Sequence, residues 1–78
     1  MESNREKVIR CLREEKYKEA MKVAKGFKYE LNAEQRDVVT RAYESYTNPR
    51  FYQSLGQDIQ ENIRKGIETL KEIYKGEL

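Results

Sequence analysis

The chain has 78 residues, of which 38% are charged and 37% are hydrophobic, and its formal net charge is +2. A chain of this length buries only a limited core, so residues 1–78 are expected to form a single domain. Its only cysteine is Cys11 and it has no histidine. This composition excludes an internal disulfide and a zinc site built from Cys and His ligands.

Two helices are expected in the first third of the chain. Ser3 with Glu6 forms a capping-box pattern, which predicts that the first helix begins at Asn4. A second helix is predicted over about 17–25, and Gly26 is expected to end it in the left-handed conformation. Two short amphipathic helices joined by a tight turn should form an antiparallel hairpin.

Four positions of this hairpin follow a known pattern. Leu12, Tyr17, Ala20 and Ala24 stand where one tetratricopeptide repeat has its characteristic residues, and the hairpin resembles such a repeat. The resemblance implies close packing of the two helices at the small Ala20. Glu15 replaces the glycine that usually precedes the aromatic residue, and no second copy follows at the 34-residue period.

A third helix is predicted over about 33–46. Asn32 with Gln35 is a capping-box pattern that marks its beginning. Its end is predicted at Thr47, because Asn48 can cap a following helix and Pro49 suits the first position of that helix.

The last third of the chain carries the longest apolar stripe, with residues at steps of three and four. Its members are Tyr52, Leu55, Ile59, Ile63, Ile67, Leu70 and Ile73. Gly56 and a cap at Asp58 favour two helices, at 49–55 and 59–75, although the unbroken phase of the stripe also fits one continuous helix. Gly66 lies inside the stripe, where a missing side chain would allow a close helix crossing.

These elements predict an all-α fold: a compact bundle of four to five short helices, with the N-terminal helical hairpin packed on a long C-terminal helix. The apolar positions of the predicted helices should form one shared core. The residues expected in that core are Val8, Leu12, Ala20, Ala24, Val38, Ala42, Leu55, Ile59, Ile63, Ile67 and Leu70.

The residues offer little for catalysis or cofactor binding. Cys11 falls on an apolar helix face and has no histidine to act as its base, so we expect a buried, inert thiol. The four glycines are isolated, which argues against a phosphate-binding loop. We therefore expect neither an enzyme nor a protein with a metal or another cofactor.

An aromatic-rich corner around Pro49 is the best candidate for a partner-binding patch. Tyrosine is enriched at interface hot spots because it combines an apolar body with a polar tip. The candidate residues are Tyr43, Tyr46, Phe51 and Tyr52; the alternative is that they cap the edge of the core. This patch predicts a small non-catalytic protein–protein interaction module, such as an inhibitor or adaptor that docks on a larger protein.

A basic stripe suggests the alternative function, a nucleic-acid-associated regulator that contacts the phosphate backbone. Residues 1–28 carry nine Lys and Arg against five acids, a net charge of +4. The candidate contacts on the hairpin are Arg10, Arg13, Lys18, Lys22 and Lys25. A solvated surface that keeps a small domain soluble explains the same residues.

The segment 31–74 also resembles the helix-turn-helix of sigma factor region 4. The likeness lies in Leu31, the Leu55-Gly56 turn and the following Arg64, whereas Tyr52 and Asn62 depart from the motif. Acidic residues in the second helix of this motif would face phosphates poorly.

Three further expectations concern the setting of the chain. The long C-terminal apolar stripe is wide enough that a second copy of the chain could cover part of it, so self-association is an alternative. The sequence contains no signal-peptide pattern and no apolar run of membrane-spanning length, so we expect a cytoplasmic protein without a membrane partner. Its size is typical of small bacterial and phage accessory proteins.

Overall fold

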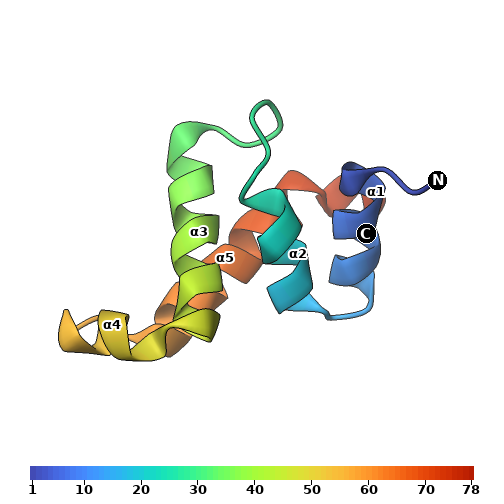
Figure 1. Ribbon diagram of the computed structural model, residues 1–78. Helices are drawn as coiled ribbons and strands as arrows, with labels where there is room; N and C mark the ends of the chain where they lie inside the picture. The colour runs from blue at the N-terminus through green and yellow to red at the C-terminus, as the bar shows by residue number, and fades with distance from the viewer.

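The computed structural model describes all 78 residues and consists of helices without strands, which confirms the all-α prediction. Figure 1 shows α3 and α5 crossing one another, the α1–α2 hairpin beside them, and α4 projecting from one end. The elements are α1 (Asn4–Arg13), α2 (Tyr17–Ala24), α3 (Ala33–Thr47), α4 (Pro49–Ser54), α5 (Ile59–Ile73) and a final 3₁₀ turn, η1 (Lys75–Glu77).

The hairpin begins with the predicted cap. The Ser3 hydroxyl accepts a hydrogen bond from the Glu6 backbone N–H at 3.1 Å, and the Glu6 carboxylate accepts one from the Ser3 N–H. The turn after α1 places Glu15 in the left-handed region, with φ of 59°. The helix α2 ends directly before Gly26, as predicted, but Gly26 does not adopt the left-handed conformation. The backbone N–H groups of residues 25–27 instead donate to carbonyls three and four residues back at 3.0–3.2 Å.

The pairing of α3 with α5 forms the largest helix interface in the bundle. A side chain at Gly66 of α5 would collide with the Cβ of Ala42 in α3 and would lie 3.1 Å from Met21 Cε of α2. The predicted close crossing at Gly66 is therefore confirmed, and three helices meet there. One turn away, Asn62 donates to the hydroxyl of buried Ser45 at 3.3 Å, and Ser45 donates to the Arg41 carbonyl at 2.8 Å.

The chain breaks between α4 and α5, as the two-helix interpretation predicted. Gly56 has φ of 78°, which a residue without Cβ adopts without strain. Asp58 then caps α5 by accepting the Glu61 N–H at 3.2 Å. Pro49 occupies the first turn of α4, but the Asn48 side chain makes no capping bond, which corrects the prediction for that residue.

The core lies where α1, α2, α3 and the second half of α5 meet. Of the predicted core residues, six are buried: Val8, Leu12, Ala20, Ala24, Ala42 and Leu70. Val38, Ile59, Ile63 and Ile67 are only partly buried. Leu55 is 57% exposed, so its assignment to the core is wrong: the turn at Gly56 separates it from the apolar face of α5.

The predicted core omits nine buried residues: Ile9, Cys11, Met21, Leu31, Val39, Ser45, Tyr52, Gly66 and Tyr74. Two of them lie outside the helices. Leu31 is in the connector between α2 and α3, and Tyr74 follows the last residue of α5. Both chain ends lie at the same end of the molecule, beside α1 (Figure 1). No helix combines the length and the hydropathy that crossing a lipid bilayer would require.

Candidate functional site

The four aromatic residues predicted as one patch have different surroundings. Tyr52 is buried, and its hydroxyl donates to Glu44 Oε1 at 3.2 Å. Burial, together with this bond, raises the pKa of Tyr52. Phe51 is 51% exposed and meets the Tyr52 ring edge-on, with ring centroids 5.2 Å apart and an interplanar angle of 84°. The buried Tyr52 ring thus packs against the Phe51 ring, and Tyr52 itself is not accessible to a partner protein.

Tyr43 and Tyr46 are half-buried against α2. The Lys25 Nζ lies 5.4 Å from the centroid of the Tyr43 ring, in a cation–π arrangement. Tyr46 lines a shallow surface hollow together with Tyr17, and burial raises the pKa of Tyr46. These two tyrosines therefore contact the hairpin, whereas Phe51 and Tyr52 belong to α4.

Of the predicted patch, only Phe51 is exposed, and Leu55, which was predicted in the core, is exposed one turn further along the chain. We call this pair of side chains the α4 tip. Each exposes about half of its surface. The other large exposed apolar residues are at the chain ends or in the α2–α3 connector: Met1, Tyr29 and Leu78. The α4 tip lies on the helix that projects from the bundle in Figure 1.

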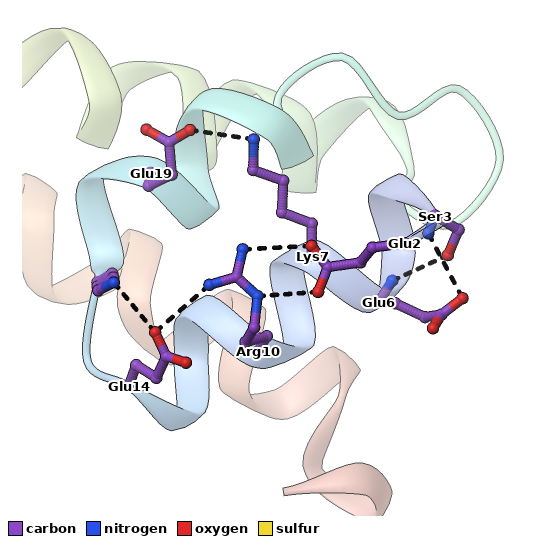
Figure 2. Close-up of polar contacts among 8 residues, drawn as sticks. Glu2, Ser3, Glu6, Lys7, Arg10, Glu14 and Glu19 are labelled. Atoms are coloured by element: carbon purple, nitrogen blue, oxygen red, sulfur yellow. Dashed lines mark hydrogen bonds and ion pairs between the residues drawn. The ribbon is translucent and has the colours of Figure 1, made fainter.

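The predicted basic stripe is divided by ion pairing. Arg10 contacts Glu2 at 2.8 Å and Glu14 at 3.4 Å, and Figure 2 shows its guanidinium held between the two carboxylates. The hydrogen bond to Glu2 lowers the pKa of that carboxyl group. Arg13 donates to the backbone carbonyl of Glu77. Both arginines are thus engaged within the chain.

The lysines of the stripe have no such partners. Lys18, Lys22 and Lys25 are exposed, and none of them takes part in an ion pair. The structure therefore keeps three of the five predicted polyanion contacts as free charges on α2 and separates them from the two arginines of α1.

The residues considered for chemistry are placed as follows. Cys11 is buried in the core. No three His, Cys, Asp or Glu side chains converge as a set of metal ligands. The largest surface hollow, of about 650 Å³, is lined entirely by polar residues: Gln35, Glu68, Thr69, Lys71, Glu72 and Lys75. None of these residues is hydrophobic, whereas most small-molecule sites are lined mainly by hydrophobic and aromatic side chains.

A polar cluster at the chain ends, which we call the clasp, was not predicted from the sequence. Arg5 donates to Glu30 at 2.7 Å and to Glu77 at 2.9 Å, and its guanidinium carbon lies 5.6 Å from the centroid of the Tyr74 ring. The Tyr74 hydroxyl donates to Glu30 Oε2 at 2.6 Å. Burial and this bond raise the pKa of Tyr74 well above its usual range. The clasp joins α1, the α2–α3 connector and the C-terminal turn.

Comparison with known proteins adds no relative: no family model, no curated protein and no solved structure matches this chain.

Proposed function

We propose that this chain is a small, non-catalytic, cytoplasmic interaction module that docks on a larger protein, as an inhibitor or adaptor does, through the α4 tip. The observation that carries the proposal is the exposure of Phe51 and Leu55 on a helix that projects from the bundle. Large apolar side chains that are exposed to solvent on a projecting helix are typical of protein-binding surfaces.

The shape of this surface favours a concave partner. Phe51 is held in place by the buried Tyr52 ring, so little conformational entropy would be lost when it enters a pocket. The neighbouring exposed side chains, Arg50, Gln53 and Gln57, would form the polar rim that surrounds the anchors of most interfaces. A second copy of the chain would bring two convex ends together and would cover each anchor poorly. The proposed occupant is therefore an apolar pocket on a different protein.

The test compares three tagged chains in an affinity capture from host lysate, with nuclease present. The test variant is Phe51→Ser with Leu55→Ser, and the matched control is Tyr29→Ser with Leu78→Ser, which removes two exposed apolar side chains elsewhere. We expect the wild type and the control to retain the same protein and the test variant to lose it. With the purified partner, calorimetry should show at least about a 10-fold weaker affinity for the test variant, since a large hydrophobic anchor contributes about 2 kcal/mol.

Equal capture by all three chains would overturn the proposal. Sedimentation equilibrium adds a second criterion: a dimer that dissociates only in the test variant would assign the α4 tip to self-association instead. Urea unfolding of each variant serves to check that a loss of binding does not arise from loss of the fold.

A further inference from the structure

The positive charge of this chain is concentrated on α2 and the residues beside it. Residues 16–28 contain five lysines and one glutamate, a net charge of +4. The remaining residues contain eleven Lys and Arg against thirteen Asp and Glu, a net charge of −2. The slight overall positive charge therefore arises from one short segment in an otherwise acidic molecule.

Three of these lysines share one side of α2. At 100° per residue, Lys18, Lys22 and Lys25 fall within about 60° of one another and span about 10 Å along the axis. Lys25 caps the helix with helical dihedrals (φ −62°, ψ −17°), so the helical arrangement extends to it.

Two more cations extend this surface beyond the end of α2. Lys28 is exposed in the connector. Arg36 of α3 donates to the carbonyls of Phe27 at 3.3 Å and Lys28 at 3.1 Å, which holds its charge beside the connector. Together these five residues form a surface that we call the lysine face: Lys18, Lys22, Lys25, Lys28 and Arg36.

No carboxylate neutralises the lysine face. None of its five cations belongs to an ion pair, whereas Arg5, Lys7, Arg10, Lys16, Arg64 and Lys75 are all paired with carboxylates. The single acid of α2, Glu19, is paired with Lys7 of α1 at 3.4 Å (Figure 2). The field of the lysine face is therefore available to an external anion.

We infer that the lysine face binds the phosphate backbone of a nucleic-acid duplex without reading its sequence. A duplex carries one phosphate per strand for about every 3.4 Å of its helix axis, so a row of flexible lysine side chains about 10 Å long faces several phosphates of the two strands. Flexible ammonium groups make phosphate contacts that fix position but carry no base information.

The neighbouring aromatic rings favour a duplex over a single strand. Recognition of a single strand depends on exposed rings on which bases can stack. Here Lys25 covers Tyr43, and Lys71 lies 5.3 Å from the centroid of the Tyr17 ring. These two rings are thus covered by cations, and the exposed ring beside the lysine face, Tyr29, offers by itself no platform on which successive bases could stack.

The experiment measures fluorescence anisotropy of a labelled random-sequence DNA duplex between about 20 and 80 mM salt. The test variant is Lys18→Gln, Lys22→Gln and Lys25→Gln. The matched control is Arg41→Gln, Arg50→Gln and Lys65→Gln, which removes three unpaired cations elsewhere and gives the same net charge. With about four phosphate contacts, the affinity of the wild type should fall about 100-fold over this fourfold range of salt.

We expect the control to keep the salt dependence of the wild type. The test variant should bind at least about 10-fold more weakly at the lowest salt, and its affinity should change only about fourfold across the range, as for one remaining contact. The Phe51→Ser, Leu55→Ser variant should bind the duplex as the wild type does, because the α4 tip lies on a different helix. This last arm separates failure of the lysine face from failure of the proposed docking function.

Three results would overturn the inference. Equal weakening of both triple variants would mean that only net charge matters. Binding of polyglutamate as tightly as the duplex, with the same loss in the test variant, would assign the lysine face to an acidic protein surface. Binding to anionic vesicles but not to the duplex would assign it to a lipid surface.

Discussion

At the end of the molecule where the chain begins and finishes, the clasp joins segments that are far apart in the sequence. Arg5 and Glu77 are 72 residues apart, yet they are paired, and Tyr74 beside them is buried. At the opposite end, the bond from Tyr52 to Glu44 is the only side-chain hydrogen bond between α4 and another helix. Many tertiary contacts hold the chain ends together at the first end. At the second end such contacts are few, and apolar side chains remain exposed there.

This difference bears on where binding can occur. Segments that open easily and carry exposed apolar side chains are common in binding surfaces, whereas a densely connected end usually maintains the fold. Three lysines of the lysine face, Lys18, Lys22 and Lys25, lie on α2 and its C-cap, and this helix packs through the buried Met21 and leaves these lysines without ion pairs. The residues that stabilise the fold and the residues that are exposed for binding thus lie in different parts of the chain.

Truncation of one leucine at each end gives the largest contrast. Leu70 is fully buried, and Leu70→Ala should lower the free energy of unfolding by about 3 kcal/mol through lost burial and the cavity left behind. Leu55 belonged to the same predicted stripe but is exposed, so Leu55→Ala should change the free energy by less than about 0.5 kcal/mol. Urea unfolding followed by circular dichroism measures both values. Similar losses for the two variants would contradict the different burial of the two ends.

The helix crossing between the two ends can be tested at Gly66. A Cβ there would collide with Ala42 and crowd Met21, so Gly66→Ala should destabilise the fold by about 2 kcal/mol, despite the better helix propensity of alanine. Gly76 has no atom within 4 Å of the position its Cβ would occupy, which makes Gly76→Ala the matched control. Thermal unfolding should show a lower midpoint for the first variant alone; an unchanged midpoint would mean that α3 and α5 separate at little cost.

Local signals in the sequence predicted the helices well. Ser3, Asn32 and Asp58 each cap a helix by accepting the N–H three residues later, so the residues that mark these boundaries are close together in the sequence. Helical periodicity likewise found Val8, Leu12, Ala20 and Ala24 of the hairpin, because 3.6 residues per turn hold within one helix.

Periodicity failed where the helix stops. Leu55 is in phase with Ile59 only if the helix continues, and the left-handed turn at Gly56 interrupts that phase. The two candidate surfaces, the aromatic patch and the basic stripe, were predicted only in part, because helical spacing does not show which side chains have partners outside their own helix. Whether Arg10 is free depends on Glu2, which lies in the segment before α1, and whether Tyr52 is free depends on the path of α4 back to Glu44. The contact of Tyr52 with Glu44 arises from the tertiary fold and the contact of Arg10 with Glu2 from a segment outside the helix, so neither has a signature in helical spacing. The pair of Arg10 with Glu14 does have one, since the two residues are four apart in the sequence.

The clasp predicts a smaller, pH-dependent effect. Tyr74→Phe removes the hydrogen bond to Glu30 and should cost about 1 kcal/mol at pH 7. Burial raises the pKa of Tyr74 in the folded chain, while in the unfolded chain it stays near 10. The folded state therefore holds this proton more tightly. The resulting stability is fully present below pH about 10 and is lost as the pH rises further, by about 1.4 kcal/mol for each pH unit.

Urea unfolding at several pH values between 7 and 11 tests this sign. The stability advantage of the wild type over Tyr74→Phe should be constant up to about pH 9, should shrink above it and should be about zero or slightly reversed at about pH 11, since only the wild type loses the contribution of this hydroxyl. Ionisation of lysines and of the other tyrosines is common to both chains and cancels in the difference. Tyr29→Phe, at a side chain that is 97% exposed, serves as the control and should match the wild type throughout. A difference that stays constant to pH 11 would show that the Tyr74 hydroxyl is not shielded from water, and that the end joined by the clasp is as open as the α4 end.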